Sequence, residues 1–113
     1  MKKNNILSKS ENFNRIIKEG KKIISKNIII YLELTTNDNY HFGLAVGKKI
    51  GNAVVRNKIK RQLRSIIDEK KYKNNFNCVI LVKKSILTQS FFDIRKEILN
   101  LFKQVNIIEE EKK

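Results

Sequence analysis

Residues 48–64 constrain this chain more than any other stretch of it. They hold seven lysines and arginines and no acidic residue, and none of the 11 acids of the chain lies between residues 39 and 67. From residue 55 onward, apolar side chains recur at the helical spacing of about 100° per residue. They are Val55, Ile59, Leu63, Ile66 and Ile67. The pattern predicts a helix over about residues 53–69, with Asn52 as its N-cap, held to a core by one apolar stripe.

Five side chains project from this helix across an arc of about 140°, and all of them can donate hydrogen bonds. They are Arg56, Asn57, Lys60, Arg61 and Arg64. An ordinary solvated face interleaves acids with its cations, whereas unrelieved like charges repel one another unless an anion is present. Three of the chain's five arginines are here, and the arginine fork pairs with phosphate through two hydrogen bonds. The helix therefore predicts a contact with nucleic acid.

The composition agrees with a polyanionic partner. The chain has 113 residues, with 25 Lys+Arg against 11 Asp+Glu and a formal net charge of +14. We expect one domain over residues 1–113, with flexible ends at 1–7 and 109–113. No apolar stretch approaches the roughly 20 residues of a membrane span, and no hydrophobic run follows the first lysines, so we expect a cytoplasmic protein. A basic amphipathic helix could lie on an anionic membrane, but the stripe of this one lacks an aromatic anchor and is needed by the fold.

The first half of the chain predicts one helix and two strands. The helix covers about residues 9–19, and the apolar, β-branched run at 28–34 has the composition of a strand that residues 22–27 could extend. A polar turn at 35–39 predicts that the chain returns as a hairpin into a second strand at about 40–47.

The second half adds a strand and a helix after the basic one. Residues 78–82 are apolar on both faces, as in a buried strand, and Ser90 can cap a last helix. The order α-β-β-α-β-α predicts an α+β fold, a two-layer αβ sandwich with one sheet of about four strands and three helices.

Small residues occupy one face of the second strand, where Gly43, Ala45 and Gly47 alternate with larger apolar side chains. Such a face lets another group approach the backbone closely. Either a tightly packed helix or a bound ligand would use it, and the sequence leaves both open.

The chain offers no catalytic constellation of its own. Cys78 lies in an apolar run and is expected to be an inert core thiol, while His41 has no cysteine, histidine or carboxylate pattern around it. The glycines near Lys48 have the wrong spacing for a phosphate loop, and the carboxylates form no metal-binding motif. We therefore expect neither a catalytic residue nor a metal ligand in the polypeptide.

Residues 48–64 follow the pattern K-K-x-G-x-A-V-x-R-N-x-x-K-R-x-x-R. This pattern is similar to the signature of the protein component of bacterial ribonuclease P. The resemblance extends to Phe13, Tyr31, the strand around residues 42–44 and the last helix, hence to nearly the whole chain. It implies a strand–helix–strand crossover that is left-handed, against the usual right-handed connection.

The resemblance also implies a function. Ribonuclease P is a ribonucleoprotein endonuclease that removes the 5′ leader of precursor tRNA. Its RNA subunit, with bound Mg²⁺, performs the hydrolysis, whereas the protein binds the RNA subunit and the single-stranded leader and so tightens and broadens substrate binding. No membrane and no obligate protein partner are implied.

Matching the family's motif residue by residue gives two sets of expected contacts. Those with RNA are Lys48, Lys49, Asn52, Arg56, Asn57, Lys58, Lys60, Arg61 and Arg64. Those lining the leader cleft are Phe13, Ile17, Tyr31, Gly43 and Ala45. Aromatic rings suit a leader of any sequence, because every base has a π-face. Two positions depart from the family: Lys58 stands where arginine is common, and Ile17 where many members carry a second aromatic, so we expect weaker stacking there.

Two other functions would use the same charge and helix. A ribosomal or other structural RNA-binding protein would have no processing role, and a DNA-binding regulator would place the basic helix in a major groove.

Overall fold

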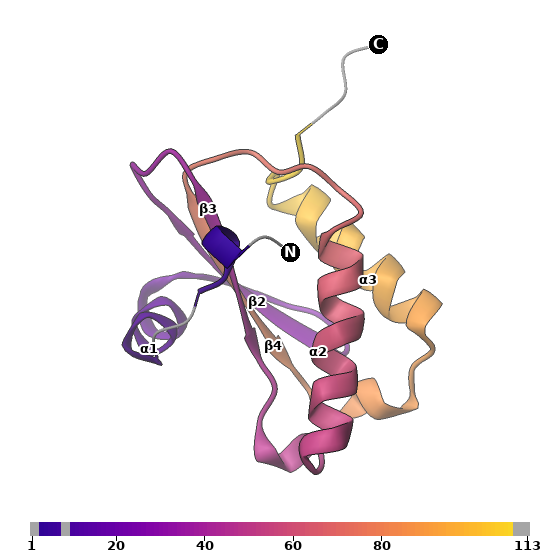
Figure 1. Ribbon diagram of the computed structural model, residues 1–113. Helices are drawn as coiled ribbons and strands as arrows, with labels where there is room; N and C mark the ends of the chain where they lie inside the picture. The colour runs from indigo at the N-terminus through magenta and orange to yellow at the C-terminus, as the bar shows by residue number, and fades with distance from the viewer. Residues whose placement is uncertain (1–2, 8–9, 110–113) are drawn as a thin grey trace.

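The computed structural model describes residues 3–7 and 10–109 and shows three α-helices packed on one four-stranded sheet (Figure 1). The helices in these ranges are α1 (Ser10–Glu19), α2 (Ala53–Ile67) and α3 (Phe91–Gln104). The strands are β1 (Lys21–Ile24), β2 (Ile28–Leu34), β3 (Tyr40–Ala45) and β4 (Phe76–Val82). Three short 3-10 helices are η1 (Lys3–Asn5), η2 (Lys48–Ile50) and η3 (Lys84–Thr88). None of the helices in the described ranges has the length and hydrophobicity that a membrane span requires.

The sheet has the strand order β1-β2-β4-β3, with β3 and β4 parallel and the other pairs antiparallel. The expected hairpin between residues 28–34 and 40–47 is therefore wrong, because β4 lies between β2 and β3. Nearly all side chains of β4 are buried, and a strand that is apolar on both faces needs cover on both, which the middle of a sheet provides. The polar turn carries the chain past β4 to the edge of the sheet.

Residues 21–24 form the separate strand β1, so they are not an extension of β2. The turn at residues 25–27 reverses the chain between these strands, and Glu97 of α3 holds it. The Glu97 carboxylate accepts hydrogen bonds from Ser25 Oγ at 2.6 Å and from the backbone N–H of Asn27 at 2.9 Å. Glu97 lies 70 residues after Asn27 in the sequence, so no local sequence pattern predicts this contact.

Helices cover both faces of the sheet, so the molecule has three layers (Figure 1). Ile30 and Ile80 point into the larger core beneath α2 and α3. Tyr31 and Val79, on the opposite face, pack with Ile16 of α1 in a smaller core. The expected two-layer sandwich describes the sheet with α2 and α3, and α1 adds a third layer.

The edge strand β3 lies where the candidate site forms. The backbone N–H of Leu7 donates to Phe42 O at 2.9 Å, so the N-terminal segment covers the edge at this point. In this segment Asn5 and Leu7 are buried. The expected flexibility of residues 1–7 and 109–113 stays a prediction, and residues 1–2 and 110–113 lie outside the described residues. Helix α2 joins β3 to its parallel neighbour β4, and the left hand of this crossover stays a prediction.

Candidate nucleic-acid interface

The start of α2 is fixed by Asn52 and Gly51. The side-chain Oδ1 of Asn52 accepts a hydrogen bond from the backbone N–H of Val55 at 3.0 Å, which is the predicted N-cap. Gly51 has a φ of 158°, and a Cβ there would lie 3.1 Å from the Val55 side chain. From this start the helix buries Ile59 and Leu63 in the core, as the apolar stripe predicts. The cations between them are thereby held on a rigid element.

The predicted RNA-contacting side chains of α2 are open to solvent to different degrees. Asn57, Lys58, Arg61 and Arg64 are exposed, whereas Arg56 and Lys60 are half-buried. The ion pairs between described residues join Arg15 to Glu33 and Arg95 to Glu69, so neither involves a cation of α2.

Arg56 carries an unmet hydrogen-bond donor. Its Nε is buried and has no hydrogen-bond partner among the residues that the structure describes. A buried guanidinium donor without an acceptor is costly, and a phosphate oxygen is an acceptor that would satisfy it. The α2 cations are thus available to an anionic partner.

A cavity of about 920 Å³ opens beside α2, at the uncovered end of β3. Apolar side chains form much of its lining, among them Phe13, Leu44, Ala45, Ile50 and Leu81. Five lysines surround them: Lys48, Lys49, Lys60, Lys83 and Lys84. A smaller hollow of about 200 Å³ shares Phe13, Leu44 and Lys60 with this cavity and adds Arg64 and Phe42. Because these two hollows share lining residues, we call them together the groove. An apolar lining bordered by cations suits unpaired bases with their phosphates at the rim.

The small-residue face of β3 is partly packed against α1 and partly open. A Cβ on Gly43 would lie 2.7 Å from the ring of Phe13, so a glycine is needed where α1 packs on the strand. Ala45, two residues further on the same face, lines the groove. No atom lies within 4 Å of a Cβ built on Gly47. Tight packing therefore explains Gly43, while Ala45 contributes to the open surface.

The other two predicted cleft residues lie deeper. Ile17 is half-buried against the smaller core. Tyr31 is only 6% exposed and packs with Leu7, Ile16 and Val79 beneath α1. It is not among the side chains that line the groove. The structure therefore brings Phe13 and Ala45 together at the groove and places Tyr31 under them.

Lys83 and Lys84 are groove residues that the sequence analysis missed. They directly follow β4, while Lys48 and Lys49 follow β3 after a short link. Since β3 and β4 are parallel neighbours, the carboxyl ends of both strands meet at one edge of the sheet. A lysine pair directly after a buried strand can be recognised in the sequence. The expected hairpin, however, does not place β4 beside β3, so it does not bring this pair next to Lys48 and Lys49.

Cys78 and His41 lie away from the groove lining. Cys78 is fully buried, and burial raises the pKa of its thiol to about 12. The imidazole Nδ1 of His41 shares a hydrogen bond with Asn77 Oδ1 at 2.9 Å. In the part of the chain that the structure describes, no three His, Cys, Asp or Glu side chains group as metal ligands would.

A three-layer α+β domain with a cationic helix beside an apolar, lysine-bordered groove belongs to the class of small RNA-binding proteins. Comparisons with known proteins identify the family within that class. A family model described as Ribonuclease P matches residues 1–106. The Ribonuclease P protein component of Bacillus pumilus (strain SAFR-032) is 34% identical over 100% of this chain and 98% of the relative. That of Bacillus cereus (strain Q1) is also 34% identical, over 92% of this chain and 93% of the relative.

Solved structures agree with this assignment. The RNase P protein from Thermotoga maritima superposes with a TM-score of 0.75 at 29% identity, covering 82% of this chain and 90% of that one. The RNase P protein of Staphylococcus aureus has the same fold, with a TM-score of 0.83 at 23% identity over 93% of this chain and 98% of that one. The chain belongs to the ribonuclease P protein family.

Proposed function

We propose that this protein is the RNA-binding subunit of a ribonuclease P that removes the 5′ leader of precursor tRNA. The observation that carries the proposal is the groove: cations on α2, η2 and the end of β4 border an apolar lining that contains Phe13. Cations pair with phosphates regardless of sequence, while an aromatic ring stacks on any unpaired base. A duplex keeps its bases stacked inside, so the arrangement favours a single-stranded segment.

The two sides of α2 suit two different RNA segments, the leader and the RNA subunit. Lys60 and Arg64 line the groove, so they neighbour the proposed leader. Arg61 and Lys58 are exposed outside its lining and suit the folded RNA subunit. Arg56, with its unmet Nε donor, is the half-buried member of this cationic surface. One helix would thereby hold the leader against the RNA that cuts it.

The hydrolysis is assigned to the RNA subunit with Mg²⁺, as the family resemblance implies. The protein's part is to bind and to position. Phosphate oxygens of the RNA are suitable ligands for Mg²⁺, whereas the described residues present no carboxylate cluster for it. The cations beside the groove would offset the negative charge of the approaching leader and so favour binding of substrate and metal together. Since precursor tRNA is made in the cytoplasm, we expect the protein to act there.

Leader-length dependence tests this proposal. The protein is reconstituted with a ribonuclease P RNA, and the dissociation constant is measured for precursor tRNAs with leaders of increasing length and for mature tRNA. We expect 5′ cleavage by the complex and affinity that rises with leader length until the groove is filled. Equal affinity for precursor and mature tRNA, without faster cleavage, would instead indicate a structural RNA-binding protein with no processing role.

A further inference from the structure

The turn between β1 and β2 is bonded to the carboxyl end of β4, where two of the groove lysines lie. Ile28, which follows the turn, pairs with Val82, the last residue of β4. The backbone N–H of Lys83 donates to Asn27 O at 2.9 Å. Lys83 and its neighbour Lys84 line the groove, so the backbone on this side of the groove takes its place from the turn.

The side chain of Lys83 is also held by the turn. Its Nζ donates a hydrogen bond to Ser25 O at 2.8 Å. An ammonium group has three donors, so this contact fixes the charge and leaves two donors for a phosphate. Lys84 is exposed and begins η3, where Ser85 Oγ donates to Lys26 O at 3.3 Å. The turn therefore supports the segment that carries both lysines.

The turn itself is held by Glu97 of α3. Glu97 Oε2 accepts hydrogen bonds from Ser25 Oγ and from the backbone N–H of Asn27, and its Oε1 accepts from Asn27 Nδ2 at 2.6 Å. A carboxylate only accepts hydrogen bonds, which suits a turn that directs three donors at it. Asn27 is 2% exposed, and a buried donor without an acceptor is costly. Loss of this carboxylate would therefore release the turn.

We propose that Glu97 is a positioning residue for the groove, which holds Lys83 and Lys84 where they meet the phosphates of the leader. The inference rests on the proposed function. Glu97 is outside the groove lining, so it acts through the turn. Because η2 and η3 lie close together, the two lysines continue the cationic border that Lys48 and Lys49 begin. Lysines that are held in place before the leader arrives lose less conformational entropy when it binds.

Glu97→Gln tests the proposal, because it replaces one acceptor by a donor with little change in shape. The glutamine oxygen can still accept from Ser25 Oγ and from the backbone of Asn27, but its NH₂ group then faces the NH₂ group of Asn27. Adding Asn27→Asp supplies an acceptor at this point and restores the original net charge. Asp93→Asn is the control, because it removes one charge from α3 a helical turn earlier, outside the groove lining.

The dissociation constants of the reconstituted holoenzyme are measured for precursor tRNA and for mature tRNA at several salt concentrations. Glu97→Gln should weaken the binding of precursor by about threefold and lower its salt dependence, while the binding of mature tRNA stays unchanged. Adding Asn27→Asp should restore most of the lost affinity. Asp93→Asn should alter neither dissociation constant.

A second background separates positioning from a general loss of stability. In a protein with Lys83→Gln and Lys84→Gln, which lacks both charges, Glu97→Gln should cause no further loss of precursor affinity. It should still lower the midpoint of urea denaturation in both backgrounds. Ser25→Ala removes only one donor to Glu97 and should cause a smaller loss that is again confined to precursor. This milder variant tests the inference if Glu97→Gln folds poorly.

The inference is overturned if these variants bind precursor like the wild type, if they lose precursor and mature tRNA equally, or if Glu97→Gln causes the same loss in both backgrounds. In each of these outcomes the wild-type protein would still prefer precursor with a long leader, so the proposed function would stand. Absence of that preference in the wild type would instead remove the proposed function.

Discussion

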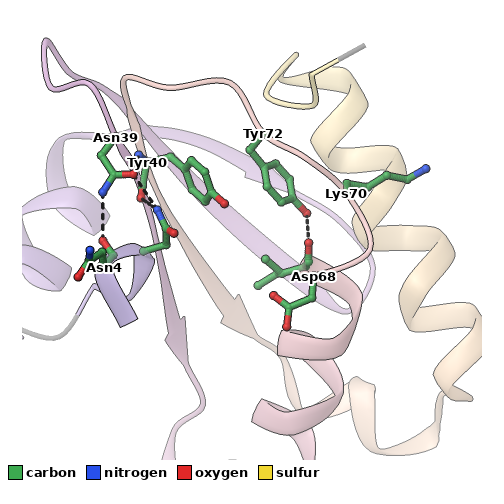
Figure 2. A pocket seen from close by; sticks show the side chains of 8 residues that line it. Asn4, Asn39, Tyr40, Asp68, Lys70 and Tyr72 are labelled. Carbon is green, nitrogen blue, oxygen red and sulfur yellow. Dashed lines mark hydrogen bonds between the residues drawn. The ribbon is translucent and has the colours of Figure 1, made fainter. Parts of the chain in front are cut away.

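The two ends of α2 border different hollows, and the charged side chains around these hollows differ. At the N-terminal end, Lys48, Lys49 and Lys60 surround an apolar lining, and the helix dipole adds positive character. At the C-terminal end, Asp68, Lys70 and Tyr40 border a second pocket of about 580 Å³, so a cation and an acid both line it (Figure 2). The first end therefore suits phosphates, whereas the second has charges of both signs.

This difference shows why the net charge alone is an incomplete guide to the partner. A charge of +14 indicates a polyanion, but it averages over a surface whose lysines gather around the groove, while the far end of α2 also carries an acid. The following substitutions and the pH titration test how the two ends of α2 differ.

Combining Arg56→Ala, Arg61→Ala and Arg64→Ala should have the largest effect. Loss of three phosphate-binding side chains should weaken affinity for the RNA subunit on the order of 100-fold and lower the slope of log K against log salt by about 2 to 3. The control combines Lys18→Ala, Lys21→Ala and Lys22→Ala, which removes the same charge from α1 and β1, away from the groove. Salt titrations of both variants that gave the same slope would show that net charge, and not the α2 surface, drives binding.

Phe13→Ala should chiefly weaken the binding of precursor tRNA. If a leader base stacks on this ring, the loss should be about 1–3 kcal/mol for precursor and near zero for mature tRNA. Phe92→Ala is a matched control, because Phe92 is 63% exposed and lies outside the groove lining. Gly43→Ala should reproduce part of the loss, since a Cβ there displaces the Phe13 ring. Equal losses for precursor and mature tRNA would contradict the assignment.

Asn52→Ala should lower the free energy of unfolding by about 1 kcal/mol, because it removes the N-cap of α2. Asn52→Ser keeps a capping oxygen and should restore most of that stability in urea denaturation. The RNA affinity of both variants then distinguishes the capping role of Asn52 from the predicted direct contact with RNA. If Asn52→Ser binds RNA like the wild type, Asn52 acts through the cap, whereas a loss equal to that of Asn52→Ala would indicate direct contact.

The smallest effect is expected at alkaline pH. The pKa values of Tyr40 and Tyr72 lie above the ordinary 10.0 in the folded protein, so the folded state holds these protons more tightly than the unfolded chain. Their contribution to stability is fully present below pH 10 and is lost as the pH rises through the folded pKa values. Asp68→Asn should lower the pKa of Tyr40, as followed by phenolate absorbance. An unchanged titration would show that no negative potential from Asp68 reaches the pocket.

Much of the fold could be predicted from local sequence, but the strand order could not. Continuous apolar runs indicated β2 and β4, alternation indicated β3, and the stripe from Val55 to Ile67 located α2 to within about two residues. The mistaken hairpin arose because alternation identifies a strand without identifying its neighbour. The separate strand β1 depends on a turn held by Glu97 from 70 residues away.

The candidate site, like the fold, could be predicted from the sequence only in part. The α2 cations follow from the motif and Phe13 from the wider family resemblance. Tyr31 is buried beneath α1, and no pattern within β2 shows which helix covers it. Lys83 and Lys84 were missed because the parallel pairing of β3 with β4 was not foreseen.

The sequence by itself determined that a cationic helix with an apolar underside would exist, because helical periodicity and capping act within a few residues. Only the tertiary structure decided what that helix lies beside. Strand order is set by which apolar faces can all be covered at once, a property of the whole chain. That order brought two separated lysine pairs to one groove beside α2.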